Sequence, residues 1–271
     1  MRWRLGVAAA LVALVAVDVA QACVRKVRWE LQPPYGVILP SGERSGYFAE
    51  LTTEALARLG CTTVLVELPW ARGLRELEEG RIDLVPGALE SADRQRFARF
   101  SRPINLSPNL LFLSAEASRR VSLAALADLR DTDLKIAVEP GSRYSNDYAQ
   151  LMRDPRFVQR LHLVQDRSLA RRMMLAGRVD GMISDQVAEL VSGIPLKPDD
   201  NDPRPVLVVS SSPDRIAFSR QTTDADFVKR FDAAINAMIE DGTLIRLRER
   251  YMPCDTDPDT LGCRVDMLSS P

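Results

Sequence analysis

The sequence predicts an α/β protein with mostly parallel sheets, arranged as two similar lobes. Three observations support this fold class. They are the chain length, short apolar runs that alternate with helical patterns, and an internal echo, by which we mean two segments with the same order of residue types. The chain has 271 residues, of which 46% are hydrophobic, so it can bury a substantial core as one large domain or two smaller ones. No stretch of the sequence is low in complexity or has the composition of a disordered segment.

The internal echo consists of LRELEEGRIDLVPG (residues 74–87) and RRMMLAGRVDGMIS (residues 171–184). Each segment has an amphipathic helix pattern, a glycine, a basic residue, a β-branched residue, an aspartate and then a short strand pattern. Gly80 and Gly177 fit the left-handed position that ends a helix. A helix followed by a glycine and a strand is also common in α/β proteins. The alternative to two similar lobes is therefore that the two segments match by coincidence.

The individual elements follow from apolar periodicity and from glycine and proline positions. Short runs rich in apolar and β-branched residues predict strands at 27–31, 63–68, 83–85, 109–113, 135–138, 181–184 and 206–210. Helical spacing predicts helices at 46–59, 71–79, 122–129, 145–152, 168–176 and 224–251.

The first 22 residues have the features of a cleaved signal peptide. Arg2 and Arg4 precede an apolar stretch at 5–17, and Ala-Gln-Ala at 20–22 supplies the small residues that a signal peptidase reads. The apolar stretch is shorter than a membrane span, and Asp18 ends it. We therefore expect cleavage after residue 22 and a mature protein in the periplasm.

Lipidation of Cys23 is the alternative to a simple cleaved signal. Cys23 would be the first residue of the mature chain and could carry a lipid anchor. Gln21, however, is large and polar where lipoprotein signals have a small residue. The sequence therefore favours a mature protein without an anchor.

An oxidising compartment would allow the four cysteines to form disulfides. Cys23 and Cys61 each precede a predicted strand, and adjacent parallel strands would bring both to the same end of one sheet. We therefore favour a Cys23–Cys61 bridge, which leaves Cys254 and Cys263 to close a short C-terminal loop.

Composition argues against metals, cofactors and nucleic acid. The only histidine, His162, stands between two leucines, and no cysteine pair has zinc-ligand spacing, so we predict a structural histidine, no metal site and no cofactor. The formal net charge of -1 and a pI near 6.0 provide no positive excess for a phosphate backbone.

Two lobes of this type place ligand-binding residues after the echoed strands, because open α/β sheets bind ligands at the carboxyl ends of their strands. In the first lobe, Gly87, Leu89 and Glu90 follow the strand and precede Arg94. In the second lobe, Asp185 follows the strand directly. The planar guanidinium of Arg94 can give two parallel hydrogen bonds to a carboxylate, and Asp185 can accept from an ammonium group. This pair suits a zwitterionic ligand.

The segment KIAVEPGSRYSNDY (residues 135–148) adds a possible anion site in the second lobe. It predicts a strand, a Pro-Gly turn and then a helix start, where free N–H groups and the helix dipole attract an anion. Gly141 and Ser142 are therefore candidates to hold the same carboxylate from the opposite side.

Each candidate also has a purely structural interpretation. Arg94 could belong to a solvated face, as its neighbouring arginines do, and Asp185 could simply cap the following helix. Tyr35 and Trp70 fit core aromatics as well as they fit ligand platforms.

The order of the motifs resembles the family 3 periplasmic solute-binding proteins of ABC-type amino-acid uptake systems. The resemblance covers nearly all of the chain after the signal peptide, and the order and spacing of the motifs are more specific than any one of them. The motifs are PPY, GYFAELTTEALARLG, PWARGLRELEEGRIDLVPGALESADRQRFARFSRPI, LKIAVEPGSRYSNDY, AGRVDGMISDQVAEL and DADFVKRFDAAINAMIEDGTLIRLRERYM.

The resemblance implies a type II periplasmic-binding-protein fold, in which two α/β lobes joined by a two-strand hinge close on a ligand. It implies a first lobe at 23–113 and 212–252, a second lobe at 114–211 and a tail at 253–271, with hinges near Leu113 and Ser211. The implied site consists of Arg94 for a carboxylate, Asp185 for an ammonium group, an anion-binding turn at Gly141, Ser142 and Arg143, an aromatic wall near Tyr35, and Trp70 at the cleft edge.

One stretch departs from the family pattern. The hydroxyl-rich stretch that precedes the arginine in such proteins is here Gly87-Ala88-Leu89-Glu90, and only Ser91 keeps a hydroxyl. Glu90 could meet a second cation, as on a basic amino acid, whereas Arg143 could favour an acidic ligand. The sequence leaves both possibilities open.

The resemblance implies a monomer that captures a small amino acid or related carboxylate by hinge closure and delivers it to an inner-membrane ABC permease, without catalysis. Two other functions stay open. Periplasmic cyclohexadienyl dehydratases share the fold, and Glu90, Glu139 or Asp185 could act as the acid in such a reaction. A protein that senses a ligand without transporting it is the second alternative.

Overall fold

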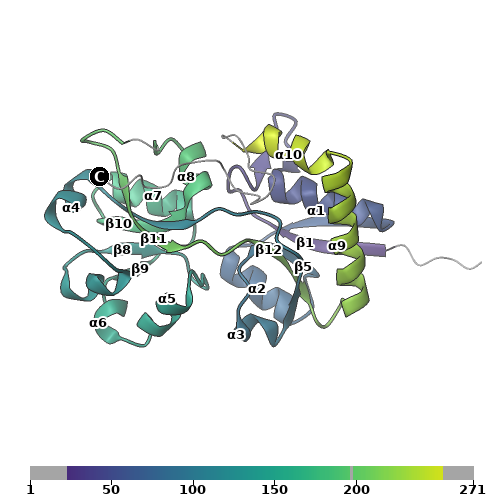
Figure 1. The fold of residues 1–271 in the computed structure, drawn as a ribbon, viewed down its shortest axis with the longest axis horizontal. Coiled ribbons are helices and arrows are strands. Elements are labelled where there is room, and N and C mark those ends of the chain that lie inside the picture. Colours follow the sequence, from purple (N-terminus) through teal and green to yellow (C-terminus); the bar gives the residue numbers. More distant parts are fainter. Residues whose placement is uncertain (1–22, 196–197, 253–271) are drawn as a thin grey trace, which may run out of the picture.

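The computed structural model describes residues 23–195 and 198–252, which form two α/β lobes side by side (Figure 1). The predicted signal peptide, the tail, and Cys254 and Cys263 lie outside the described residues. Within the part of the chain that the structure describes, no helix is long and apolar enough to cross a membrane.

The first lobe is built on a five-stranded sheet of order β4-β1-β5-β12-β6. β1 runs parallel to β4 and β5, whereas β12 runs antiparallel to β5 and β6. Its strands are β1 (Cys23–Trp29), β4 (Cys61–Glu67), β5 (Leu84–Ala88), β6 (Ala98–Phe100) and β12 (Arg215–Ser219), with a small hairpin of β2 (Val37–Ile38) and β3 (Arg44–Ser45). Its helices are α1 (Tyr47–Arg58), α2 (Trp70–Glu78), α3 (Ala92–Gln95), α9 (Ala225–Glu240) and α10 (Thr243–Tyr251).

The second lobe is built on a five-stranded sheet of order β11-β7-β10-β8-β9. Its strands are β7 (Asn109–Leu113), β8 (Ile136–Val138), β9 (Leu161–Leu163), β10 (Gly181–Asp185) and β11 (Arg204–Ser210). Its helices are α4 (Ala115–Arg120), a 3-10 turn (Leu126–Asp131), α5 (Asn146–Leu151), α6 (Pro155–Val158), α7 (Arg167–Leu175) and α8 (Gln186–Val191).

The inner strand β7 shows why the second lobe forms a three-layer structure. Leu111 and Leu113 lie in one apolar core, whereas Leu110 and Phe112 lie in another. Because alternate residues of a strand point to opposite faces, an unbroken apolar run is the pattern of a strand covered on both sides.

The two sheets repeat one topology, which explains the internal echo. Read from β9 to β11, the second sheet has three parallel strands, then one strand that is antiparallel to both of its neighbours, and then the edge strand. The first sheet has the same arrangement from β4 to β6. Gly80 and Gly177, which follow α2 and α7, have φ angles of 72° and 65°. The prediction of two similar lobes is confirmed.

The echoed aspartates perform the same structural task in each lobe. Asp83 accepts a hydrogen bond from the backbone N–H of Lys26 at 2.7 Å, and Asp180 accepts one from the N–H of Lys135 at 2.8 Å. Each carboxylate thus ties the start of its strand to the neighbouring parallel strand. These two aspartates are structural residues.

The chain crosses between the lobes at 101–108 and at 211–214. The predicted first boundary at Leu113 was wrong, because β7 pairs with β10 and β11 and so belongs to the second lobe. The two crossings pair with each other: Asp214 N donates to Asn105 O at 2.8 Å, and Ile104 N donates to Asp214 O at 2.9 Å.

Other differences from the predicted elements have local causes. The helix predicted at 224–251 is divided into α9 and α10 because Gly242 has a φ of 75°, which ends regular helix geometry. The helix predicted at 122–129 is a 3-10 turn that begins at Leu126. The short strands β6, β9 and β12 were not predicted.

The predicted disulfide between Cys23 and Cys61 is present. The two residues lie opposite each other at the start of the parallel strands β1 and β4, with Cα atoms 4.4 Å apart. His162 lies in β9, and the described residues contain no group of three or more side chains arranged to hold a metal ion.

Candidate functional site

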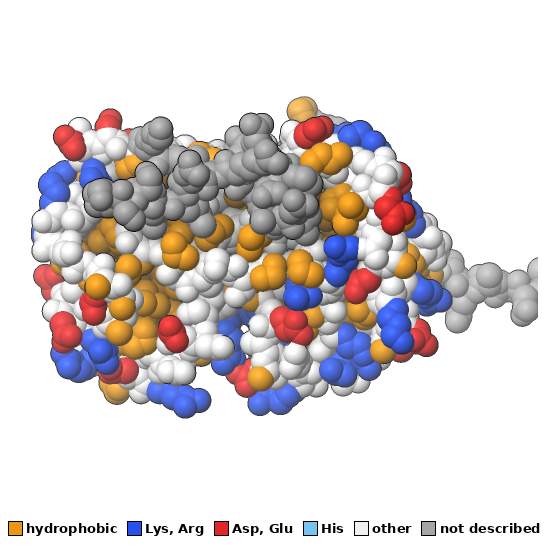
Figure 2. Space-filling view, in the orientation of Figure 1, with side chains coloured by type: hydrophobic (Ala, Val, Ile, Leu, Met, Phe, Trp, Pro, Cys, Tyr) orange, Lys and Arg blue, Asp and Glu red, His pale blue; other side chains and the backbone are white. Residues whose placement is uncertain are grey.

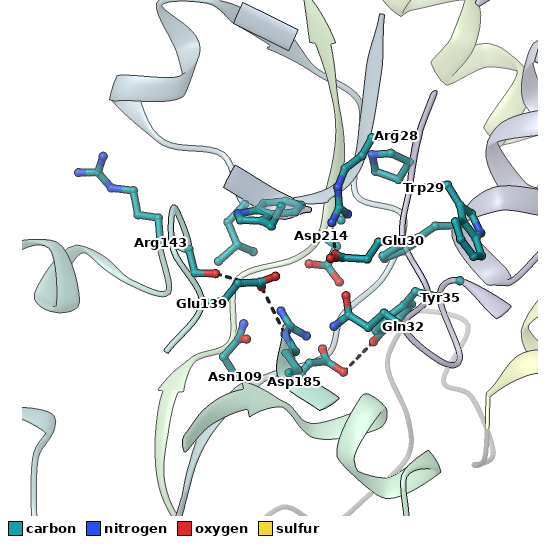
Figure 3. Close-up of a pocket in the computed structure, with 18 of the residues that line it drawn as sticks. Arg28, Trp29, Glu30, Gln32, Tyr35, Asn109, Glu139, Arg143, Asp185 and Asp214 are labelled. Carbon is teal, nitrogen blue, oxygen red and sulfur yellow. Dashed lines mark hydrogen bonds and ion pairs between the residues drawn. The ribbon is translucent and has the colours of Figure 1, made fainter. Parts of the chain in front are cut away.

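A pocket lies between the two lobes, beside the crossing segments (Figure 3). Its volume is about 790 Å³, including the part that is open to solvent. The space-filling view shows the lobes in contact through the middle of the molecule and a narrow notch between them at the lower edge (Figure 2). The predicted residues that line the pocket are Tyr35, Trp70, Gly87, Leu89, Arg94, Ser142, Arg143 and Asp185.

Arg94 is a buried cation at this pocket, and only 5% of the residue is exposed. Its Nη1 donates to the carbonyl of Leu89 at 2.8 Å, and its Nη2 donates to the carbonyl of Gly141 at 3.1 Å. None of the ion pairs among the described residues includes Arg94, and burial lowers the pKa of its guanidinium to about 10. Arg94 therefore does not belong to a solvated face, and it remains charged at neutral pH.

Trp70, the first residue of α2, forms a wall beside Arg94. The guanidinium carbon of Arg94 lies 5.5 Å from the centre of the indole, and that of Arg28 lies 5.0 Å from it. The indole N–H donates to the carbonyl of Gly141 in the opposite lobe at 3.3 Å. One aromatic ring thus contacts two arginines and both lobes.

Asp185 ends β10 and is the N-cap of α8. Its Oδ1 accepts a hydrogen bond from the backbone N–H of Ala188 at 2.8 Å and another from the Tyr35 hydroxyl at 2.9 Å. The capping interpretation of Asp185 is therefore correct, and the residue also lines the pocket. Tyr35 is buried and stacks on Phe48, with ring centres 4.4 Å apart.

A hydrogen-bond network joins this contact to the crossing segments. Asn105 Nδ2 donates to Asp214 Oδ2 at 2.9 Å and approaches the Tyr35 hydroxyl at 3.4 Å. Burial, and then the charge of Asp185, raise the pKa of Asp214 to about 8. Asp214 is therefore mostly protonated at neutral pH.

Two further charged residues of the pocket, Arg28 and Glu30, come from the first lobe and were not predicted. They are two residues apart at the end of β1, form an ion pair, and lie together in Figure 3. Arg28 Nε also donates to the carbonyl of Leu68 at 3.1 Å. Burial lowers the pKa of the Arg28 guanidinium and raises the pKa of the Glu30 carboxyl group. The charge of Glu30 raises the pKa of Arg28, and the charge of Arg28 lowers the pKa of Glu30, so the ion pair opposes both effects of burial.

The second lobe contributes a similar pair, Glu139 and Arg167. Glu139 follows β8 and Arg167 begins α7, and their Oε2 and Nε atoms are 3.8 Å apart. Burial raises the pKa of Glu139, against the charges of Arg167 and Arg28. Burial alone would lower the pKa of Arg167, but Glu139 and Asp185 together raise it.

Gln32 connects this second pair to the first lobe. With its amide oriented so that the oxygen faces Arg167, Gln32 accepts from Arg167 Nη1 at 2.8 Å and from Nε at 3.1 Å. The sequence signal that could have found the two ion pairs is the position of their members at the end of a strand or the start of a helix, and Gln32 has no such signal.

Two predicted charged candidates have partners outside the pocket. Glu90 does not line the pocket; its carboxylate lies 3.3 Å from Arg215 Nε and accepts from Gln95 at 2.8 Å. Arg143 forms an ion pair with Asp93 of the first lobe, and Figure 3 shows its side chain directed away from the centre of the pocket. Both charges are therefore paired within the protein in this structure.

The predicted anion-binding turn also differs from the structure. The helix α5 begins at Asn146, capped by the Ser145 hydroxyl, so Gly141 and Ser142 precede the helix by several residues. The N–H of Ser142 donates to the carbonyl of Glu139 at 3.2 Å, and Gly141 presents its carbonyl to Arg94. This turn holds the guanidinium rather than an anion.

Residues 26–253 match the bacterial extracellular solute-binding proteins, family 3. The chain belongs to this family. The match covers both lobes, so the family assignment and the two-lobe structure describe the same part of the chain.

Solved structures of three kinds share the fold. An ancestral arginine-binding protein bound to arginine is 21% identical, with 85% of this chain and 98% of that chain covered and a TM-score of 0.70. A histidine kinase sensor domain with similarity to periplasmic binding proteins is 21% identical, with 85% and 96% covered and a TM-score of 0.69. An ancestral amino acid-binding protein, a precursor of cyclohexadienyl dehydratase, is 19% identical, with 84% and 94% covered and a TM-score of 0.66. At these identities the likeness shows the fold, which is the expected type II periplasmic-binding-protein fold.

Proposed function

We propose that this family 3 solute-binding protein acts in the periplasm, captures an amino acid by hinge closure and delivers it to an ABC-type permease. One observation carries the proposal: Arg94 from one lobe, which is buried and has no ion-pair partner among the described residues, lines the same pocket as Asp185 from the other lobe. The family consists of extracellular solute-binding proteins, which agrees with the signal peptide expected at the start of the chain.

The two side chains can hold the two charged groups of an amino acid. Arg94 now donates to two neutral carbonyls, and a ligand carboxylate is a stronger acceptor for a guanidinium than a carbonyl. Both described donors to Asp185 use Oδ1, so Oδ2 can accept from a ligand ammonium group.

The positions of these residues also explain why binding would close the hinge. Arg94 lies in the first lobe and Asp185 in the second, and the chain crosses between the lobes only at 101–108 and 211–214 within the described residues. A ligand that contacts both lobes binds the closed arrangement better than the open one, and this difference shifts the population. A permease could then distinguish the loaded from the empty protein by its shape.

A thermal-shift screen tests the proposal. The mature protein is unfolded and refolded to remove carried-over ligand, and is then heated with amino acids, polyamines or small organic acids. A ligand at 100 times its dissociation constant adds about 2.7 kcal/mol, or roughly 5 to 10 °C for a protein of this size. We expect shifts with amino acids. Shifts only with compounds that lack an α-amino group would contradict the proposal.

A catalytic function is the second candidate, and Asp214 is the observation that favours it. Its carboxyl group lies in the pocket and is mostly protonated at neutral pH, as a proton donor in a dehydration would be. Conversion of prephenate or arogenate by the purified protein would support the catalytic function over ligand capture. Ligand-induced shifts without conversion would support capture.

Sensing without transport differs from uptake only in the partner protein. A permease and ATPase gene pair beside this gene would support uptake, whereas a lone gene beside a signalling protein would support sensing. The binding site described above serves either role.

A further inference from the structure

Four charged side chains beside the Arg94 anchor form two ion pairs, one on each side of the cleft. Arg28 and Glu30 pair on the first lobe, and Glu139 and Arg167 pair on the second. All four line the pocket, and the charges of the second pair act on the pKa values of Arg28 and Glu30. Figure 3 shows Arg28, Glu30 and Glu139 directed toward the same space.

This cluster lies within reach of a ligand that is held by Arg94. Arg28 and Arg94 both contact the indole of Trp70, at 5.0 Å and 5.5 Å from its centre. An amino acid whose carboxylate binds Arg94 would therefore extend its side chain along Trp70 toward the Arg28–Glu30 pair.

The charges of the pocket balance once the backbone groups of such a ligand are bound. Arg94 takes the carboxylate, Asp185 takes the ammonium group, and each of the two ion pairs is neutral. Asp214 is mostly protonated at neutral pH and so adds little charge. The other two candidates for side-chain selection, Glu90 and Arg143, are engaged with Arg215 and Asp93.

We propose that the ligand side chain is uncharged and polar, of the carboxamide or ureido type, and that the Arg28–Glu30 and Arg167–Glu139 pairs recognise it. Such a group both donates and accepts, so it can bond to a carboxylate and a guanidinium at once. A charged side chain would bring an uncompensated charge into a buried site whose ions are already paired. An apolar side chain would cover these ions without giving them a hydrogen bond.

This inference rests on the proposed function, and matched ligand pairs test it separately. Glutamine and glutamate, and citrulline and arginine, differ in side-chain charge with little change in shape. Calorimetric titration of the refolded protein should give affinities about tenfold or more higher for glutamine than for glutamate, and for citrulline than for arginine. Leucine serves as the apolar reference and should bind more weakly than glutamine or citrulline.

Two variants of the first-lobe pair identify the residues responsible. Glu30→Gln leaves Arg28 without its carboxylate, so the ratio of glutamate to glutamine affinity should rise about tenfold. Arg28→Gln leaves Glu30 without its cation, so the ratio of arginine to citrulline affinity should rise by a similar factor, about tenfold. Glu90→Gln, outside the pocket, is the control and should change neither ratio.

The outcomes separate the two claims. If an amino acid binds but the tightest ligand is charged or is leucine, the inference on the side chain is wrong and the proposed function stands. If no amino acid binds, both are wrong. The affinity ratios of the wild-type protein decide this even if a variant folds poorly.

Discussion

The Tyr35 hydroxyl donates a hydrogen bond to Asp185 Oδ1 across the cleft, at 2.9 Å. Asp185 comes from the N-cap of α8, and the same oxygen also accepts from the helix N–H of Ala188. The residue thus combines a structural task with a place in the pocket, because Oδ1 accepts both described hydrogen bonds and Oδ2 accepts neither. The contact ties a first-lobe loop to the second lobe at the position where the ligand ammonium group is proposed.

Tyr35→Phe should weaken amino-acid binding about fivefold, because the closed arrangement loses one hydrogen bond of about 1 kcal/mol between the lobes. The phenylalanine keeps the stack on Phe48, so the unfolding temperature should change little. Calorimetric titration measures the affinity. Tyr251→Phe is the matched control, because its hydroxyl bonds to Ser45 within the first lobe. Equal effects of the two variants would contradict the role of Tyr35 in closure.

Asp214 predicts a pH dependence of stability. Its pKa rises from the ordinary value of 3.8 to about 8 in the folded protein, so the folded state holds a proton that the unfolded state releases between these values. The stability that this proton contributes is full below about pH 4 and is lost as the pH rises through 8.

Thermal melts of the wild type and of Asp214→Asn across this range test the prediction. The difference in melting temperature, wild type minus variant, should fall from about pH 4 to about pH 8 and then level off. Asp226→Asn is the control, since 83% of that side chain is exposed. A difference that stays constant with pH would show that Asp214 does not hold this proton.

The Cys23–Cys61 disulfide predicts a change in stability without a change in affinity. It closes a loop with a sequence separation of 38 residues, and neither cysteine lines the pocket. Replacing both cysteines with serine should lower the free energy of unfolding by about 4 kcal/mol, with the dissociation constant unchanged. Denaturant titration and calorimetry measure the two quantities. A fully folded variant that binds the ligand more weakly would contradict the prediction that the disulfide affects stability and not affinity.

Local sequence signals predicted much of the fold. The echo around Gly80 and Gly177 depends on residues close together in the chain, so it could be read without the structure. The strands β6, β9 and β12 were missed because three to five residues give little periodicity. The first hinge was misplaced because β7 is apolar from Leu110 to Leu113, and such a run does not show which sheet it joins.

Local sequence signals also predicted part of the candidate site. Arg94 and Asp185 were predicted because each follows a strand that the echo identified. Arg28 and Glu30 have a signal, since residues two apart on a strand share a face, but charged residues on a strand also fit a solvated surface. Asp214 has no such local signal, because its position depends on pairing with Asn105 across 109 residues of chain.

The ion pairs of Glu90 and Arg143 could not be predicted from the sequence for a related reason. Their partners, Arg215 and Asp93, are distant in the sequence and are brought close only by the packing of the second crossing and of the two lobes. A charged residue beside a predicted cleft therefore indicates a candidate, and only its contacts show whether it is free to bind a ligand.

The most direct test of the amino-acid clamp is a calorimetric titration of wild type, Arg94→Ala and Arg96→Ala with the amino acid that gives the largest thermal shift. Arg96 is the control because 77% of its side chain is exposed. Arg94→Ala should lose about 2 kcal/mol of binding free energy, or about thirtyfold in affinity, since a buried carboxylate loses its main partner. Arg96→Ala should bind as the wild type does. Equal affinities of Arg94→Ala and wild type would contradict the clamp.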